Sequence, residues 1–353
     1  MRMLDAPGYC LRHPRLPSAV ALNKHLQSTM RLRKAGRPGS GSGDTAPKAG
    51  KLRFGPAGWM YKDWDGTVYP RPKPPRFDQL RYISRFFDAV EVNSSFYGPP
   101  LATTSSSWVR RVEDNANFRF TAKLWKRFTH ERAKAWTTAE VDQVRPGFDV
   151  LMESGKLGAV LLQFPWSFRH TEPNREWLDD VVRTFSLYPL VVEVRHESWL
   201  VPEFLRTLEE EGVGFVNIDQ PLYHDSIGPT AHLTSHVGYI RVHGRNYKDW
   251  FREKAPVEQR YNYLYRADEL KPWAERAEEL ASDPGARETY VITNNHYKGK
   301  AVANALMLKS MVSGERSTAP SAVYETYRDV LREFAEPEDE LAGKSASLLT
   351  ARP

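Results

Sequence analysis

Short apolar runs alternate with longer amphipathic stretches along the chain from Lys51 onward. Each run holds four to seven residues and is rich in β-branched or aromatic side chains, a composition typical of strands. We predict strands at residues 52–55, 89–94, 118–123, 159–164, 190–195, 213–219, 238–244 and 289–295.

Six further segments have apolar residues at helical spacing and separate or follow these strands. We predict helices within residues 77–87, 138–155, 174–185, 202–212, 267–281 and 300–312. Gly212 ends the fourth segment, where it suits a C-cap because glycine accepts left-handed backbone. Alternation of strands and helices predicts parallel βαβ units.

Polar residues inside the strands distinguish a closed barrel from an open doubly wound sheet. Strands of an open parallel sheet are covered on both faces and read as continuous apolar runs. Several strands here instead alternate polar and apolar residues, as expected when one face lines a barrel. The strands number eight, and "GPAGW" after the first lacks the spacing of a phosphate-binding loop. We therefore predict an α/β fold, a single (β/α)8 TIM-like barrel.

Five strands carry two polar residues separated by one position. Both members of such a pair share a face, and the later member lies nearer the C-terminal end, where TIM-barrel active sites lie. Because unpaired buried charges cost several kcal/mol, we expect these side chains to pair across a common lumen. The pairs are Glu91/Asn93, Thr121/Lys123, Glu193/Arg195, Asn217/Asp219 and Arg241/His243.

Charge separates the first 50 residues from the rest of the chain. The 353 residues include 50 Lys and Arg against 44 Asp and Glu, a formal net charge of +6. Residues 1–50 contain nine of these bases and two of the acids, which leaves 41 bases and 42 acids. Nucleic acid is not the favoured partner of so neutral a body.

We expect three regions along the chain. Residues 1–50 form a disordered basic leader that ends in the flexible linker "RPGSGSGDTAPKAG", 51–315 form the barrel, and 316–353 form a C-terminal helix and flexible tail. Three interpretations of the leader stay open: it binds an acidic surface, it is a transit-like segment, or its start codon is assigned too early.

Two absences indicate a cytoplasmic protein with no membrane partner. The chain has no run of about 18 apolar residues, and its N-terminus lacks the charged-then-apolar order of a secretory signal. Cys10 is the single cysteine, so neither a disulfide within the chain nor a cysteine metal cluster can form.

Seven motifs stand in a recognisable order: "GPAGWMYKDWDGTVYP", "VEVNSSFYGPP", "KLWKRFTHER", "LLQFPWSF", "EVRHESW", "YIRVHGRN" and "VITNNHYKGKAVANALML". The series resembles the YecE-like family, domain of unknown function 72, over about residues 52–312. The resemblance implies a TIM-like barrel and leaves the activity unassigned. Trp166 stands where the family often has a second proline, and Val68 where it often has Phe.

Candidate catalytic residues cluster at the ends of two strands. If the protein is a hydrolase or isomerase, we expect Glu193 as acid or base, His243 as its proton-transfer partner and His196 as a proton shuttle. Arg195 and Arg241 would clamp an anion, because a guanidinium binds phosphate or carboxylate through two parallel hydrogen bonds. Alternatively, the Glu–Arg pair is an ion pair that closes the barrel interior.

Further ligand contacts are expected on the strands and in the loops that follow them. Aromatic rings there would stack on sugars or bases. Lys123 could bind an anion or form an imine, although nothing in the sequence indicates the desolvated environment that an imine-forming lysine needs. These candidate contacts are Trp59, Tyr61, Glu91, Asn93, Tyr97, Lys123, His130, Gln163, Trp199, Asp219, Arg245, Asn246, Asn294 and Asn295.

No cofactor or metal is predicted, because the ten histidines show no HxH or HExxH spacing. A divalent metal held by Glu91, Asp219, Glu193 and His243 from separate strands remains an alternative. A glycosidase-type pair of Glu91 and Glu193 is another.

The sequence thus favours a protein that binds a polar anionic small molecule, such as a phosphorylated sugar or nucleotide, in a charged lumen. Two rivals remain. One is a metal-dependent phosphodiesterase acting on nucleic acid, by analogy of fold. The other is a non-catalytic barrel that holds a ligand or a protein partner.

Overall fold

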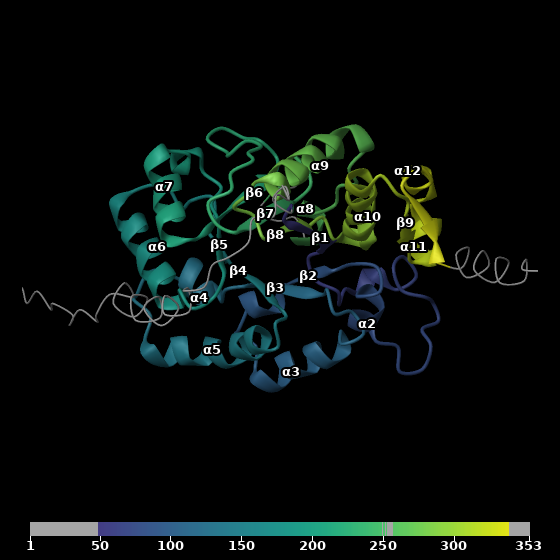
Figure 1. Ribbon diagram of the computed structural model, residues 1–353, viewed down its shortest axis with the longest axis horizontal. Coiled ribbons are helices and arrows are strands. Elements are labelled where there is room, and N and C mark those ends of the chain that lie inside the picture. The colour runs from purple at the N-terminus through teal and green to yellow at the C-terminus, as the bar shows by residue number, and fades with distance from the viewer. Residues whose placement is uncertain (1–48, 249, 251, 253–256, 339–353) are drawn as a thin grey trace, which may run out of the picture. The chain divides into compact units, whose positions relative to one another are not determined.

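All eight predicted strands are present, and they form one parallel sheet that curves into a barrel (Figure 1). The computed structural model describes residues 49–248, 250, 252 and 257–338, so the expected leader falls outside it up to residue 48. The strand order is β1-β8-β7-β6-β5-β4-β3-β2. The strands are β1 (Lys51–Pro56), β2 (Ala89–Val92), β3 (Arg119–Lys123), β4 (Leu157–Gln163), β5 (Leu190–Glu193), β6 (Gly214–Asp219), β7 (Val237–Val242) and β8 (Glu288–Thr293).

The seam between β1 and β2 nearly closes the barrel. Ala57 forms a parallel bridge with Glu91, and the amide of Gly58 donates to the Glu91 carbonyl at 2.8 Å. Gly55 permits this close approach, since a Cβ there would lie 1.8 Å from the Ala89 carbonyl oxygen. The predicted TIM-like barrel is therefore confirmed.

Helices flank the strands in Figure 1, and each of the six predicted helical segments contains one. The longer helices are α3 (Ala102–Arg111), α5 (Thr138–Glu153), α6 (Glu172–Phe185), α7 (Pro202–Glu211), α9 (Ala267–Ser282) and α10 (Lys300–Ser313). The shorter helices and 3₁₀ turns are η1 (Lys62–Trp64), α2 (Gln79–Ile83), η2 (Ser94–Phe96), α4 (Lys126–Thr129), η3 (Glu197–Trp199), α8 (Val257–Arg260) and η4 (Tyr297–Gly299).

Helix α3 was not predicted from the spacing of its apolar residues; its sequence is "ATTSSSWVRR". Only Ser105 and Trp108 of this helix are buried, so the helical spacing of apolar residues is too sparse to detect. Gly212, in contrast, ends α7 as expected, with left-handed backbone at φ 67°.

The connection from β6 to β7 departs from strand–helix alternation. Residues 220–236 contain neither a helix nor a strand. Asn217 of β6 holds this loop against the barrel, because its Oδ1 accepts from the His232 amide and the Thr230 hydroxyl, both at 2.8 Å. The loop therefore covers the outer face of β6 in the place of a helix.

The C-terminal region differs from the single helix expected after residue 315. Strands β9 (Ser317–Ala319) and β10 (Ala335–Pro337) pair in parallel, and two short helices, α11 (Ser321–Thr326) and α12 (Arg328–Leu331), connect them. The expected flexible tail beyond residue 338 lies outside the described residues.

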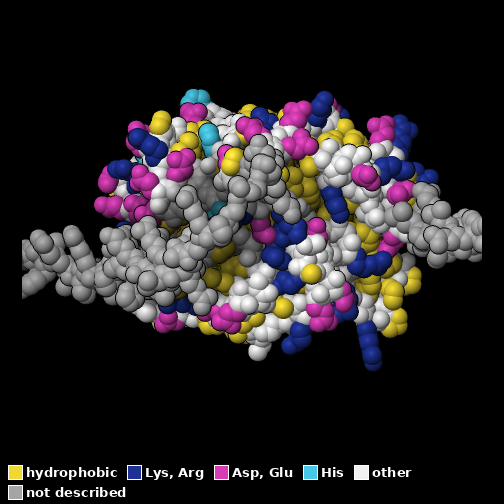
Figure 2. All heavy atoms as spheres, viewed as in Figure 1, with side chains coloured by type: hydrophobic (Ala, Val, Ile, Leu, Met, Phe, Trp, Pro, Cys, Tyr) yellow, Lys and Arg dark blue, Asp and Glu magenta, His cyan; other side chains and the backbone are white. Residues whose placement is uncertain are grey.

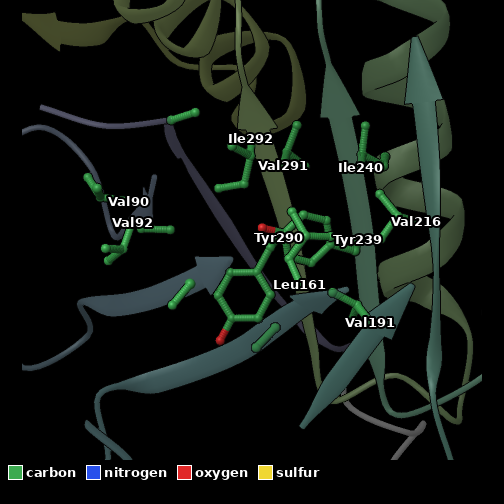
Figure 3. Packing of buried hydrophobic residues seen from close by; sticks show 14 of the residues in the cluster. Val90, Val92, Leu161, Val191, Val216, Tyr239, Ile240, Tyr290, Val291 and Ile292 are labelled. Atoms are coloured by element: carbon green, nitrogen blue, oxygen red, sulfur yellow. The ribbon is translucent and has the colours of Figure 1, made fainter. Parts of the chain in front are cut away.

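Side chains fill the N-terminal half of the barrel. Leu161, Val191 and Val216 surround the rings of Tyr239 and Tyr290, whose centroids are 6.0 Å apart (Figure 3). All five side chains are fully buried. Within the barrel interior, the described side chains consequently leave space for a ligand toward the C-terminal ends of the strands, as in other TIM barrels.

Candidate functional site

Arg241 is the centre of the polar lumen. From β7, its Nη2 donates to Glu91 Oε1 of β2 at 2.7 Å, and its Nη1 donates to Glu193 Oε2 of β5. All three side chains are completely buried. One guanidinium thus joins three strands and offsets the charges of two carboxylates that would otherwise be strongly destabilising.

Arg195 continues the network toward solvent. Its Nε and Nη2 both donate to Glu193 Oε1, at 2.8 and 2.6 Å, and 14% of its side chain is exposed. Burial raises the pKa of Glu193, but the charges of Arg241 and Arg195 outweigh burial and hold that pKa well below its ordinary value. Glu193 is thus an ionised carboxylate whose two oxygens both accept hydrogen bonds. This arrangement suits a residue that positions Arg195 better than one that transfers protons.

His243 lies next to Glu193 and is completely buried. Its Nε2 is 3.4 Å from Glu193 Oε1, and its Nδ1 is 3.0 Å from the amide nitrogen of Asn294. Burial outweighs the opposing charge of Glu193 and lowers the pKa of His243 to about 3. The imidazole is therefore neutral at physiological pH.

Lys123 ends β3 beside Glu91. Its Nζ lies 4.0 Å from Glu91 Oε1 and 5.6 Å from the centre of the Phe96 ring, and 12% of its side chain is exposed. Burial, and next the charge of Arg241, lower the pKa of Lys123 to about 8.

These side chains carry more positive than negative charge. We use the name lumen charge cluster for Glu91, Lys123, Glu193, Arg195 and Arg241. With Lys123 protonated, three cations face two carboxylates. The cluster then has one positive charge in excess, and its two partly exposed members are both cations.

Two adjoining compartments open above the lumen charge cluster. The large compartment has a volume of about 730 Å³, and the small compartment has a volume of about 190 Å³. Both are lined by His130, Gln163 and Tyr261. Lys123 lines the large compartment, and Arg195 lines the small one. The two partly exposed cations of the cluster thus reach the ligand space from two adjacent positions.

The model of a family described as "Protein of unknown function DUF72" matches residues 53–326. The chain belongs to the DUF72 family. The UPF0759 protein YunF of Bacillus subtilis (strain 168) is 28% identical over 279 residues, which cover 75% of this chain and 96% of YunF.

Solved DUF72 structures resemble this chain in fold. A DUF72 protein from Thermotoga maritima MSB8 has a TM-score of 0.66 and 33% identity, covering 74% of this chain and 99% of its own. A DUF72 protein from Enterococcus faecalis V583 has a TM-score of 0.64 and 25% identity, covering 74% of this chain and 95% of its own.

No helix among the described residues is long and apolar enough to cross a membrane.

Many of the predicted contact residues of this DUF72 chain surround the compartments. The fold brings together side chains from β1, β2, β3, β4, β5 and β8 or from the turns after these strands. Those that line a compartment are Tyr61, Asn93, Tyr97, Lys123, His130, Gln163, Arg195 and Asn294.

Three other candidates pack beneath the surface of the DUF72 barrel. Trp59 is buried edge-to-face against Trp108, with ring centroids 5.6 Å apart. Trp199 is fully buried, and its indole donates to the Phe168 carbonyl at 2.6 Å. His196 begins η3, where its Nδ1 accepts from the Ser198 amide at 3.2 Å. None of the three is among the described residues that line a compartment.

The expectation that β6 contributes Asn217 and Asp219 to the shared lumen is wrong. Ile218 pairs in register with Arg241, so Ile218 shares the lumen face while its two neighbours point outward. Asp219 accepts from Arg245 Nη2 at 2.9 Å and from the Tyr265 hydroxyl. Asp219 and Arg245 therefore form a separate ion pair outside the lumen.

Two asparagines predicted as ligand contacts hold loops instead. Asn246 donates to the Gln259 carbonyl at 2.6 Å. Asn295 donates to the Tyr263 carbonyl and to Asn304 Oδ1, both at 2.8 Å. Neither lines a compartment within the described part of the chain.

The four side chains considered as metal ligands do not converge. Glu91 and Glu193 are bonded to Arg241, and Asp219 faces away from both. Among the described residues, no group of three or more His, Cys, Asp or Glu side chains is arranged to hold a metal ion. Both glutamates are also completely buried, so neither could contact a sugar in the compartments. The two carboxyl groups of a glycosidase, in contrast, flank the sugar bond that they cleave.

Sequence reasoning missed several lining residues, notably Gln220, Arg260 and Tyr261. Arg260 and Tyr261 follow β7 by almost twenty positions, too far for strand periodicity to place them. The segment "RYNYLY" that contains them is conspicuously aromatic, and this was the available signal.

Proposed function

We propose that this DUF72 protein binds a polar anionic small molecule in the two compartments. Arg195 and Lys123 are the principal contacts for its carboxylate or phosphate group. The observation that carries the proposal is the excess positive charge of the lumen charge cluster, whose partly exposed members are both cations. A bound anion would neutralise this excess in a partly desolvated site, where charge-assisted hydrogen bonds are strong.

The geometry of Arg195 supports its role as the anion contact. Glu193 occupies Nε and Nη2, and among the described residues Nη1 has no hydrogen-bond partner. The Trp250 ring centre lies 5.8 Å from the guanidinium. Glu193 and Trp250 together restrict the side chain, so less conformational entropy would be lost when it binds an anion.

Neutral groups in the large compartment favour a ligand that also carries hydroxyls or a ring. Within the described residues, the buried Oδ1 of Asn93 has no hydrogen-bond partner and would accept from a hydroxyl group. The Tyr61 and His296 rings stack at 4.3 Å and line the same space. A phosphorylated sugar or a related metabolite combines an anionic group, hydroxyl groups and a ring, which are the three features that this lining suits.

Nucleic acid remains the less favoured ligand. On the face shown in Figure 2, Lys and Arg side chains are interspersed with Asp and Glu side chains. A protein that follows a phosphate backbone presents a continuous basic surface. The mixed charge of this face supports a small ligand confined to the pocket.

Calorimetric titration with inorganic phosphate tests the proposed function. R195M is expected to bind phosphate at least about tenfold more weakly, because it loses a charge-assisted hydrogen bond of about 1.5–3 kcal/mol. R206M, which changes an exposed arginine of α7, is the matched control and retains wild-type affinity. Equal affinity of R195M and the wild type, or no binding by the wild type, would contradict the proposal.

A further inference from the structure

We propose that Lys123 forms an imine with an aldehyde or ketone that carries an anionic group. The inference rests on the proposed function, because the same two compartments hold the ligand, and it adds a covalent step and a substrate class. Four features of the described residues carry it: the isolation of the amine, its electrostatic surroundings, its access to space and the position of Arg195.

The Lys123 amine lacks the close partner that a structural lysine has. Among the described residues its Nζ makes no hydrogen bond, and its nearest carboxylate oxygen is Glu91 Oε1 at 4.0 Å. That oxygen already accepts from Arg241 at 2.7 Å, and Oε2 accepts from the Tyr239 hydroxyl at 3.0 Å. An ammonium group in a committed ion pair lies at about 2.7–2.9 Å. Glu91 is therefore a distant partner of Lys123 that is shared with Arg241 and Tyr239.

Burial, and next the charge of Arg241, shift Lys123 toward its neutral form, while the ammonium form still predominates at neutral pH. Arg241 of β7 and Arg195 after β5 oppose its positive charge, and Glu91 of β2 and Glu193 of β5 favour it. His130 is neutral, because burial and the charge of Arg195 lower its pKa to about 4. With burial added, the pKa of Lys123 falls to about 8, which leaves an appreciable fraction of free amine near neutral pH.

The compartments place an anionic group and a carbonyl group at the same time. Arg195 lines the small compartment and Lys123 the large one, and His130 and Gln163 line both. A carboxylate or phosphate in the small compartment would therefore direct the carbonyl of the same molecule toward Lys123. This arrangement selects a carbonyl compound with an anionic group over a neutral carbonyl compound.

The covalent step is balanced without a further reagent. The amine lone pair attacks the carbonyl carbon, the C–N bond forms as the C=O π bond breaks, and one proton passes from nitrogen to oxygen to give a carbinolamine. The second proton of the nitrogen then passes to the hydroxyl group, the C–O bond breaks, and water leaves as the C=N bond forms. The products are the imine and one water molecule, with no oxidation or reduction.

Reductive trapping tests the inference on the full chain. The protein is incubated with pyruvate and sodium borohydride, and the modified lysines are mapped by mass spectrometry. Lys123 is expected to be modified at least tenfold faster than any other lysine. The rate is expected to rise with pH around a midpoint near 8, because only the neutral amine reacts. Replacing pyruvate with acetone, which lacks the carboxylate, is expected to abolish the preference for Lys123.

Two variants separate this reaction from general lysine reactivity. K123R keeps the positive charge but cannot form an imine, so the dominant adduct is expected to disappear. K309M is the control, because Lys309 of α10 also has a pKa lowered by burial but donates to the Phe86 carbonyl at 2.9 Å, away from the compartments. K309M is expected to retain the Lys123 adduct.

The outcomes distinguish the two proposals. Adducts distributed over the exposed lysines, or an unchanged pattern in K123R, would overturn the imine. Absence of any Lys123 adduct in a wild-type protein whose phosphate affinity depends on Arg195 would overturn the imine and leave the proposed function intact. Absence of both the adduct and phosphate binding would remove the proposed function as well.

Discussion

At the residue scale, Glu193 illustrates how a side chain that resembles a catalytic acid can have a positioning role. Each of its oxygens accepts from a guanidinium, and it is completely buried. The groups that reach the compartments are its partner Arg195 and the neighbouring Lys123. The pattern "EVRHESW" predicted the charges, but only the arrangement of Arg241 and Arg195 around Glu193 distinguishes the buried anion from the exposed cation.

Replacing Glu193 is expected to affect stability before chemistry. E193Q leaves Arg241 with one carboxylate partner in a fully buried site, and we expect the free energy of unfolding at pH 7 to fall by about 3 kcal/mol or more. Urea denaturation measures this change. E203Q, which removes an exposed charge on α7, is the control and is expected to change stability little. Wild-type stability of E193Q would contradict the positioning role.

At the element scale, the partner strands decide which face of a strand points inward. Strand β6 alternates polar and apolar residues as β2, β3, β5 and β7 do, yet it presents Ile218 to the lumen. Because a shift of one residue exchanges the two faces, the alternation alone does not identify the inner one. This orientation of β6 also explains the helix-free connection of residues 220–236. Asn217 points outward and holds that connection against the barrel.

The β1–β2 seam offers a test of barrel closure. G55A would place a Cβ 1.8 Å from the carbonyl oxygen of Ala89, where backbone and not a flexible side chain must move. We expect the free energy of unfolding to fall by more than about 2 kcal/mol. G98A is the matched control, because a Cβ at Gly98 meets no atom within 4 Å, and its effect is expected within about 0.5 kcal/mol. Chemical denaturation compares the two, and equal stability would contradict the close contact at the seam.

At the scale of the whole molecule, histidines with lowered pKa values make the stability of the barrel depend on pH. Burial lowers the pKa of five of them below the ordinary value of 6.5, so the unfolded chain takes up protons first as the pH falls. Stability is therefore expected to decrease from pH 6.5 downward. These residues are His130, His170, His232, His236 and His243.

His243 is expected to contribute strongly to this slope, because its pKa in the folded state is about 3. Its share approaches about 1.4 kcal/mol per pH unit between pH 6 and pH 4. H243N is expected to flatten the curve of unfolding free energy against pH over the range 6 to 5, where Glu193 stays ionised in both variants. H224N, at a fully exposed position, is the control. An unchanged slope in H243N would contradict the neutral buried imidazole.

The sequence by itself determined the eight strands, six of the helices and the polar character of four lumen faces. These features depend on neighbouring residues, because periodicity, caps and turn residues act over a few positions. The chain order of the seven motifs also indicated the DUF72 family, which the comparison with known families confirmed. The same local patterns placed Lys123, Arg195 and Asn294 at the C-terminal ends of their strands.

Only the tertiary structure decided which charges pair, which face of β6 is internal and how Lys123 is desolvated. Each depends on residues from distant segments: Arg241 against Glu91 and Glu193, and Ile218 in register with Arg241. Pairing energies and pKa values follow from separations in space, to which sequence distance gives no access. The lowered pKa of Lys123, on which its proposed chemistry depends, is a property of the assembled barrel.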